Sequence, residues 1–348
     1  MSFHSRLPGY SPTPLTEVPA LAKELGVGRV FVKDESYRFG LSAFKALGAS
    51  WAIANLLLER SGGAETADLS ELRSFAARNP IEFVAATDGN HGRAVAWMAT
   101  LVGLRAHIFV PVVTSPKMIS AIAAEGAKVT AVSGSYDEAV ELAAAEVSAN
   151  SSAVLVQDTA WPGYINVPTR IVEGYTTLFD EIDLQMEGIN TTSSSLIAVP
   201  VGVGSLAQAA VTHYRSKNDS RNVSILSVEA DSAACLLSSL ISGDQISVPT
   251  DVTNMAGLNC GTVSSLAWPY LQGGIDAAIS VSDILAAQAV LDLAECGISS
   301  GPSGASSLAG ARSALCGKGS RRRREEIDIN QNSVVVLLST EGNSGLVS

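Results

Sequence analysis

The chain has 348 residues, of which 47% are hydrophobic and 16% charged, and its formal net charge is -11. This composition is typical of a well-packed globular protein and excludes a disordered one, while the negative charge argues against nucleic acid or an anionic membrane as the main partner. Because the sequence shows neither a signal-peptide pattern nor an apolar run long enough to span a bilayer, we expect a soluble protein of the cytoplasm.

The first patterned stretch of the chain ends in a lysine at the start of a helix. A helix over residues 18–25 and a strand over 30–32 precede a polar turn, and a second helix then runs from Lys45 to Gly62. A cation is mildly disfavoured in the first turn of a helix, where the helix dipole is positive. A partly desolvated lysine in such a place is a usable amine nucleophile, although an ordinary surface lysine is the alternative.

The middle of the chain alternates between short apolar strands and helices. We expect strands at 81–87, 106–110, 128–132 and 153–157, with helices at 91–102, 115–124 and 136–148. Strands separated by helices of this length predict right-handed crossovers and a parallel, helix-covered sheet.

The same alternation resumes after a helix over residues 168–187. We expect further strands at 196–201, 223–229 and 334–338, and helices at 205–214, 233–241, 282–295 and 303–315. The Ser-, Gly- and Asn-rich segment 242–274 and the basic run Arg321–Arg324 are expected to be loops.

Together these elements predict an α/β fold of two unequal domains, each with a mostly parallel, helix-flanked sheet. The large domain is expected to comprise residues 1–47 and 163–348, and the small domain residues 48–162. Ligands of such sheets bind beyond the carboxyl ends of the strands, so unusual residues at strand ends are the candidate site.

The first such strand end is Thr87-Asp88-Gly89-Asn90-His91-Gly92-Arg93. Its glycines and asparagine allow backbone N–H groups to converge at a helix N-terminus, which suits an anion such as a carboxylate. Asp88 is unexpected in an anion site and is therefore a candidate acid or base. An ordinary strand-to-helix turn remains the alternative.

Two further strand ends carry weaker signals. The loop Gly202-Val203-Gly204-Ser205 resembles a phosphate-binding loop at a helix N-terminus, but it lacks a Walker A lysine and has Ala207 where a third glycine would stand. Ser339 and Thr340 place hydroxyls at the end of a buried strand, where they would either hydrogen-bond a ring nitrogen or cap a turn.

Together these segments resemble the fold type II pyridoxal-phosphate enzymes, the tryptophan synthase β-like superfamily. Lys33-x-Glu35 followed by Ser42-Ala43-Phe44-Lys45 is similar to the lysine motif of that superfamily, and Gly89-Asn90-His91 to its asparagine loop. Within the superfamily the sequence most resembles the diaminopropionate ammonia-lyases, with which it shares Thr87-Asp88-Gly89-Asn90-His91-Gly92-Arg93 and Gln157-Asp158-Thr159-Ala160-Trp161.

The resemblance implies pyridoxal 5'-phosphate as the cofactor and an α,β-elimination on 2,3-diaminopropionate or a similar β-substituted amino acid, giving ammonia and a 2-oxo acid such as pyruvate. Lys45 would hold the cofactor, and Asp88 or Asp158 would act with it as acid or base. The other cofactor-binding residues implied are Phe44, Asn90, Gly202, Val203, Gly204, Ser205, Ser339 and Thr340. The substrate carboxylate would be bound by Thr87, Gly89, Asn90, His91 and Gly92.

The sequence departs from the family in the stretch Ser300-Gly301-Pro302-Ser303-Gly304, where Pro302 replaces a glutamate. This leaves open β-replacement or racemisation of a related amino acid in a biosynthetic pathway. A cofactor-binding protein without turnover is a separate alternative. The family is usually dimeric, so a homodimer is expected. Cys235 and Cys260 lie on segments that match the lyases and are expected to be free thiols that could approach each other. The four cysteines include no CxxC pair, so no metal is expected.

Overall fold

The computed structural model describes residues 3–62, 68–87, 89–134, 136–189, 191, 194–216 and 223–343. The chain groups into two compact units: unit 1 is Met1–Ser11 with Lys45–Tyr175, and unit 2 is Pro12–Phe44 with Thr176–Ser348. The domain boundaries expected from the sequence, 1–47 with 163–348 and 48–162, stay a prediction.

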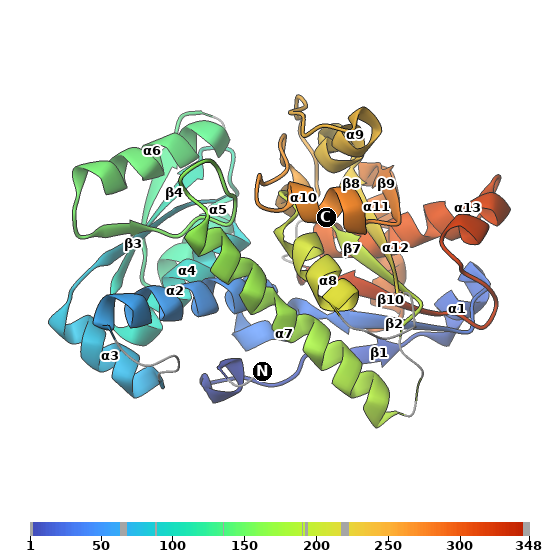
Figure 1. Cartoon of the computed structure of the whole chain (residues 1–348), viewed down its shortest axis with the longest axis horizontal. Coiled ribbons are helices and arrows are strands. Elements are labelled where there is room, and N and C mark those ends of the chain that lie inside the picture. The colour runs from blue at the N-terminus through green and yellow to red at the C-terminus, as the bar shows by residue number, and fades with distance from the viewer. Residues whose placement is uncertain are drawn as a thin grey trace. The chain divides into compact units, whose positions relative to one another are not determined.

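Unit 1 is a four-stranded parallel sheet with helices around it (Figure 1). Its strands follow the order β5-β4-β3-β6 in the sheet, and every neighbouring pair is parallel. Its elements are η1 (His4–Arg6), α2 (Lys45–Ser61), α3 (Leu69–Arg78), β3 (Glu82–Ala86), α4 (Asn90–Val102), β4 (Arg105–Pro111), α5 (Pro116–Ala124), β5 (Lys128–Val132), α6 (Tyr136–Ala149), β6 (Ala153–Leu155) and the first part of α7 (Asn166–Gly188).

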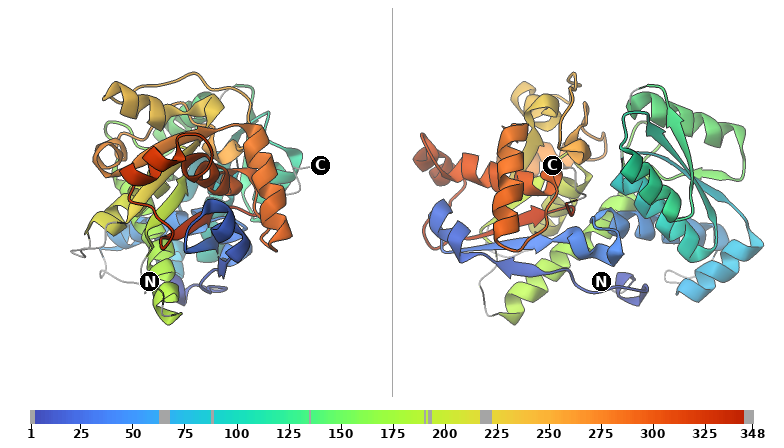
Figure 2. Two further views of the ribbon diagram at one scale, coloured as in Figure 1. Left: turned by 90° about the vertical axis from the view of Figure 1, so that its right-hand side faces the viewer. Right: turned by 180° about the vertical axis from the view of Figure 1, so that it is seen from behind.

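Helices cover both faces of this sheet (Figure 2) because its strands are apolar on both sides. Val84 and Phe109 pack with Ala139 and Ala143 of α6 on one face. Ile108 points to the other face, since successive side chains of a strand alternate. There it meets α4 at Gly92, where a Cβ would lie 2.7 Å from Ile108 Cγ2.

Unit 2 is a six-stranded sheet in the order β1-β2-β10-β7-β8-β9, parallel except for β1. Its first elements are β1 (Leu15–Glu17), α1 (Pro19–Leu25), β2 (Arg29–Asp34), η2 (Glu35–Gly40), the rest of α7, β7 (Leu196–Pro200), α8 (Ser205–Ser216), β8 (Ser224–Ala230), η3 (Asp231–Ala233) and α9 (Cys235–Ser242). They are followed by η4 (Ala256–Leu258), α10 (Trp268–Gly274), β9 (Ala277–Val281), α11 (Asp283–Glu295), α12 (Pro302–Leu315), α13 (Ser320–Glu326) and β10 (Val334–Ser339).

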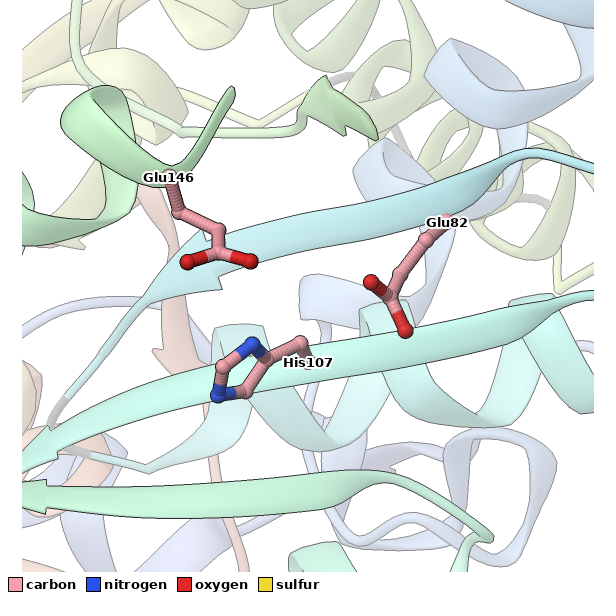
Figure 3. Close-up of side chains that lie close together, drawn as sticks. All are labelled: Glu82, His107 and Glu146. Atoms are coloured by element: carbon pink, nitrogen blue, oxygen red, sulfur yellow. The ribbon is translucent and has the colours of Figure 1, made fainter. Parts of the chain in front are cut away.

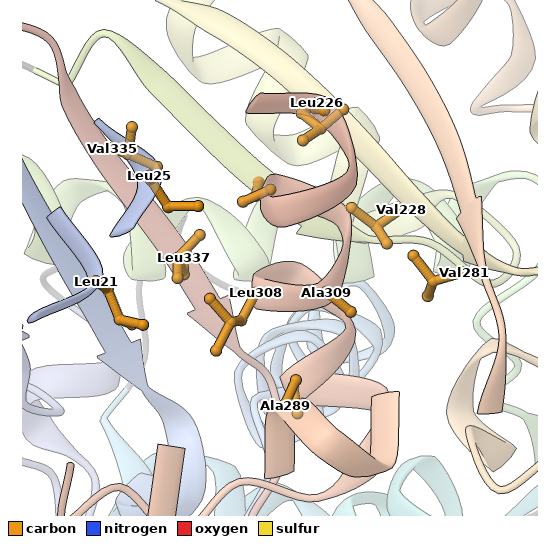
Figure 4. Packing of buried hydrophobic residues seen from close by; sticks show 14 of the residues in the cluster. Leu21, Leu25, Leu226, Val228, Val281, Ala289, Leu308, Ala309, Val335 and Leu337 are labelled. Carbon is orange, nitrogen blue, oxygen red and sulfur yellow. The ribbon is translucent and has the colours of Figure 1, made fainter. Parts of the chain in front are cut away.

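The core of unit 2 lies between this sheet and the buried helix α12 (Figure 4). Leu308 and Ala309 of α12 pack against apolar side chains of β8 and β10. The approach is close, because a Cβ on Gly310 would lie 2.3 Å from Cγ2 of Val228. The small residues of α12 therefore let the helix pack directly on the strands.

The fold class is as predicted, an α/β protein with two mostly parallel sheets flanked by helices. Elements that the sequence did not lead us to expect are β1, α3, α10, β9 and α13. The segment 242–274 is not entirely loop, since α10 occupies its last residues. Within the described residues, no helix has both the length and the apolar character needed to cross a membrane.

The expected loop at Arg321–Arg324 is a helix, α13, and the prediction was wrong. Arg321 and Arg322 form ion pairs one turn ahead with Glu325 and Glu326, which supports a helix. The next two arginines have a different role. Arg323 Nε donates to the carbonyl of Ala314 at 2.8 Å and Arg324 Nε to that of Leu315 at 3.0 Å, so they bind carbonyl groups at the C-terminal end of α12.

Candidate active site

Lys45 is the first residue of α2, and its amine meets a buried carboxylate of the same unit. Its Nζ donates to Asp158 Oδ2 at 2.5 Å, and the lysine and aspartate side chains are 19% and 6% exposed. Burial acts to raise the pKa of Asp158, but the positive charge of Lys45 outweighs it and holds that pKa down at about 2. The pair is therefore a salt bridge between a part-buried lysine and a buried carboxylate.

His91 lies beside this pair as a neutral imidazole. Burial lowers its pKa, and Nε2 lies 2.8 Å from the carbonyl of Val156, to which it donates. The other nitrogen, Nδ1, is then an acceptor 3.8 Å from Asp158 Oδ2, and it has no hydrogen-bond partner among the described residues. The sequence had indicated only a backbone role for His91, so this side-chain position is new.

The predicted carboxylate-binding turn is a tight connection between β3 and α4. The N–H of Gly89 donates to Thr87 Oγ1 at 2.9 Å, and Asn90 is the first residue of the helix. A Cβ on Gly92 would lie 2.3 Å from Thr87 Cγ2, so only glycine permits this approach. Asp88 lies outside the described residues, and its role stays a prediction.

Gln157 fixes the end of β3 from which this turn departs. Its side-chain amide accepts from the N–H of Ala86 and donates to the carbonyl of Ala86, each at 3.0 Å. Its Nε2 also donates to the hydroxyl of Tyr136 at 2.6 Å. The sequence had indicated no role for this residue, and the one signal available was its place directly before Asp158.

In unit 2 the glycine loop after β7 has the form of an anion cradle. A Cβ on Gly202 would lie 2.7 Å from the carbonyl oxygen of Gly257, and Gly204 has a φ of +94°, which favours glycine. Ser205, 5% exposed, begins α8. Bare backbone at a helix N-terminus presents N–H groups to an anion such as a phosphate.

The predicted hydroxyl at the end of β10 is buried and already oriented. Ser339 is 0% exposed, and its Oγ donates to Oγ of Ser300 at 2.8 Å. The next residue, Thr340, accepts the N–H of Phe44 at its carbonyl, 3.2 Å away. Thus the residue that precedes Lys45 in the chain is attached to the end of β10.

A buried ionic cluster in unit 2 accounts for the Lys33-x-Glu35 part of the lysine motif. Arg38 donates two hydrogen bonds to Glu35 and two to Glu181, at 2.7–2.9 Å. Lys33 Nζ donates to Glu181 Oε2 at 2.7 Å, and the hydroxyl of Thr13 donates to Glu35 at 2.6 Å. Two cations and two anions compensate one another there, so these residues support the turn instead of reacting.

The turn that this cluster supports is conformationally demanding. Phe39 and Ser42 both have positive φ, 50° and 58°, although neither is glycine. Such conformations are held only when the surroundings fix them. Glu35 and Arg38 belong to η2 itself, so the ionic cluster fixes the backbone just before Lys45.

None of the four cysteines forms a disulfide bond, as expected for Cys235 and Cys260. Both lie near the glycine loop. Cys235 Sγ is 3.8 Å from the carbonyl oxygen of Gly202, and Cys260 Sγ is 3.1 Å from the position of a Cβ on the same glycine.

Each unit by itself contains groups that fit pyridoxal phosphate. Unit 2 has a glycine loop at the N-terminus of α8, closely packed at Gly202, and a buried hydroxyl at Ser339. Unit 1 provides a lysine amine with a carboxylate partner. These are the chemical groups that an α/β enzyme with a phosphorylated, lysine-bound cofactor requires.

The family model described as "Pyridoxal-phosphate dependent enzyme" matches residues 6–340, and the chain belongs to this family. It is 37% identical to diaminopropionate ammonia-lyase of Escherichia coli strain K12 over 350 residues, which cover 98% of this chain and 87% of that protein. The crystal structure of the Escherichia coli enzyme in complex with an aminoacrylate-PLP azomethine reaction intermediate superposes with a TM-score of 0.88 at 35% identity, covering 98% of this chain and 86% of that one. The complex of that enzyme with D-serine gives a TM-score of 0.89 at 35% identity, covering 98% and 87%.

Proposed function

We propose that this protein is an ammonia-lyase that acts on 2,3-diaminopropionate or a similar β-substituted amino acid. The observation that carries the proposal is the buried pair of Lys45 Nζ and Asp158 Oδ2, 2.5 Å apart. It supplies both an amine for the cofactor and a group that can move a proton. The similarity to diaminopropionate ammonia-lyases over nearly the whole chain supports the choice of substrate.

Each part of the cofactor has a proposed partner. Lys45 would bind its aldehyde carbon, the loop Gly202–Ser205 would bind the phosphate, Asn90 would donate a hydrogen bond to its phenolic oxygen, and Phe44 would belong to the cofactor site. Ser339 or Thr340 meets the ring nitrogen with an uncharged hydroxyl. The cofactor supplies an electron sink for the bond pair left when the α-proton departs.

Proton transfer in this proposal depends on the changing charge of Lys45. While Nζ is an ammonium, it keeps Asp158 ionised. When Nζ is no longer a charged ammonium beside Asp158, burial becomes the larger effect and the pKa of Asp158 rises. Asp158 can then hold a proton and deliver it to the departing β-amine, which is a poor leaving group unless protonated. Lys45 Nζ takes the α-proton, and Asp88 remains an alternative acid or base.

The reaction is balanced by water. The β carbon–nitrogen bond breaks, and its electron pair leaves with the protonated amine as ammonia. The aminoacrylate that remains takes up water and yields pyruvate and a second ammonia. The substrate carboxylate is proposed to bind at Thr87, Gly89, Asn90, His91 and Gly92, because this turn leads into the N-terminus of α4, where backbone N–H groups suit an anion.

The test is release of pyruvate and ammonia by the purified, cofactor-saturated protein from each enantiomer of 2,3-diaminopropionate. Lys45→Ala should abolish both turnover and the visible absorbance of lysine-bound cofactor. Asp158→Asn should keep the absorbance and lower kcat about 10²–10⁴-fold, which is the range for a lost acid or base. Lys23→Ala, at an exposed lysine, is the control and should change neither.

Failure of the loaded wild-type protein with both enantiomers would falsify the lyase assignment. Racemised substrate without pyruvate would favour racemisation, and a new β-substituted product would favour β-replacement. Pro302 at the start of α12 is the feature that keeps those two reactions open. Cofactor absorbance that no amino acid changes would identify a binding protein without turnover. A homodimer in the cytoplasm is also proposed, on the resemblance alone, and the mass in solution tests the dimer.

A further inference from the structure

Three side chains with metal-ligand chemistry meet on one face of the sheet of unit 1, away from the proposed active site (Figure 3). They are Glu82 at the start of β3, His107 in β4 and Glu146 in α6. His107 pairs with Val84, two residues after Glu82, so both side chains point to the face that α6 covers. One ligand atom from each residue lies within 4.8 Å of the others.

The imidazole of His107 is buried and held in one orientation. It is 3% exposed, and Nε2 lies 2.8 Å from Oγ1 of Thr130 on the neighbouring strand β5. The remaining nitrogen, Nδ1, is on the side of the ring that faces the two carboxylates (Figure 3). In a metal-binding histidine, one ring nitrogen usually makes a hydrogen bond that fixes the ring, and the other nitrogen binds the metal. His107 has this arrangement, with the second nitrogen directed at acidic oxygens.

Two basic residues lie near this cluster, and both are exposed: Lys128, which pairs with His107 on the neighbouring strand, and Arg105 beside Glu82. The hydrogen bond of His107 with Thr130 uses Nε2 and leaves Nδ1 for a ligand. Glu82 Oε1 lies 3.7 Å from Nε of Arg105, whose side chain is 79% exposed, and an exposed pair of this kind contributes little.

We propose that Glu82, His107 and Glu146 bind a divalent first-row transition-metal ion. One imidazole nitrogen with two carboxylate oxygens suits Zn²⁺ or Mn²⁺, whereas Mg²⁺ prefers oxygen ligands alone. Bonds of about 2.0–2.2 Å to one ion require ligand atoms about 3–3.5 Å apart. The ligand atoms lie within 4.8 Å of one another, so the two flexible glutamate side chains would rotate to reach this spacing.

The position of the site indicates a structural use. Glu82 is the first residue of β3, and the proposed substrate turn begins at Thr87, after the other end of the same strand. An ion held by β3, β4 and α6 would link three elements that otherwise meet through small apolar side chains such as Ala139 and Ala143. A bound ion would therefore stabilise unit 1, and it would take no part in the proposed elimination.

The test is metal binding by the cofactor-loaded protein after chelator treatment and dialysis, measured by calorimetry with Zn²⁺ and, for comparison, Mg²⁺. We expect one Zn²⁺ per chain with a raised melting temperature, and much weaker Mg²⁺ binding. Glu82→Gln and Glu146→Gln should each weaken Zn²⁺ binding at least about tenfold, as loss of even an outer partner does. Glu141→Gln, at an exposed glutamate of the same helix, is the matched control and should bind as the wild type does.

Two outcomes overturn the proposal. One is Zn²⁺ binding that is equally strong in all four proteins, because the ion would then be held elsewhere, for example by the cysteines. The other is no Zn²⁺ binding by the wild-type protein, because the three side chains would then not form a metal site. Turnover is not the readout, so neither outcome depends on the proposed lyase activity.

Discussion

Arg38 lies buried between the carboxylates of Glu35 and Glu181 and donates two hydrogen bonds to each. The pKa of Glu181 is correspondingly lowered to about 2; burial acts to raise it, and Arg38 and Lys33 more than offset that effect. Removing one partner of such a buried ion pair lowers the free energy of unfolding strongly, because the other partner stays buried without a compensating charge. The cluster thus makes the backbone before Lys45 depend on a glutamate far away in the sequence.

Replacing Glu181 by glutamine should therefore destabilise the protein strongly. We expect Glu181→Gln to lower the free energy of unfolding in urea by about 3–5 kcal/mol, since Arg38 and Lys33 would share one carboxylate. Glu187→Gln on the same helix, at an exposed position, should change it by less than about 0.5 kcal/mol. A loss below about 1 kcal/mol in the first variant would show that the cluster does not hold the turn.

At this scale the sequence predicted the reactive residues better than their partners. Lys45 stood out because a cation at a helix start is locally disfavoured, and the structure pairs it with a second candidate, Asp158. Glu181, by contrast, is 143 residues from Arg38 in the chain, and only tertiary packing brings them together. The Ser300 hydroxyl that binds Ser339 could not be predicted for the same reason.

At the scale of elements, the helix α9 begins on a buried carboxylate. Glu229 at the end of β8 accepts the N–H groups of Leu236 and Leu237, each at 2.7 Å. Burial raises its pKa to about 7, although these two hydrogen bonds lower it. Between pH 4.5 and about 7, Glu229 therefore stays protonated in the folded protein. In the unfolded chain the glutamate has its ordinary pKa of 4.5 and has lost this proton.

This difference predicts an unusual pH dependence of stability. Because the folded state binds the extra proton, Glu229 contributes fully to the free energy of unfolding below pH 4.5. As the pH rises to about 7 this contribution is lost, and the free energy of unfolding falls by up to about 3 kcal/mol. The stability difference between the wild type and Glu229→Gln, from urea denaturation at several pH values, should shrink over that range. The exposed Glu295→Gln is the control, with a constant difference. A constant difference for Glu229→Gln as well would contradict the raised pKa.

The glycine loop before α8 gives a second prediction at this scale. Alanine at Gly204 would have to adopt a φ of +94° in the proposed phosphate-binding loop. Gly204→Ala should therefore lower cofactor affinity about 5- to 30-fold, as a cost of about 1–2 kcal/mol implies. Gly243→Ala has a similar φ of +81° at the end of α9 and open space around it. It should cost stability without changing cofactor affinity, measured by titration of the visible absorbance. Equal cofactor affinity in the two variants would remove Gly204 from the cofactor site.

The strands and helices that the sequence missed have weak or overlooked patterns. β9 is an edge strand of small residues, half-buried along most of its length, so it lacks the apolar run of a central strand. α10 contains Pro269 and ends in two glycines, which resemble a loop. The start of α3 was detectable, because Asp68 and Glu71 form a capping box whose spacing is visible in the sequence.

For the whole molecule, the alternation of strands and helices was sufficient to predict two parallel sheets. Buried parallel strands are continuous apolar runs, which is the strongest pattern a sequence offers. The order of strands within each sheet was not predictable in the same way. It places β10 between β2 and β7, although these strands are far apart in the chain, and pairing at such separation depends on the complete fold.

The central position of β10 has a consequence for synthesis on the ribosome. Unit 1 has its whole sheet once β6 has emerged, near the middle of the chain. The sheet of unit 2 must remain in two pieces, β1–β2 and β7–β8–β9, until β10 has emerged, because the strand that joins them is made after all the others. During that interval β2 and β7 each present an open, apolar edge, which is the form in which nascent chains aggregate or bind chaperones. The half that carries the glycine loop thus completes its sheet long after the other half has done so.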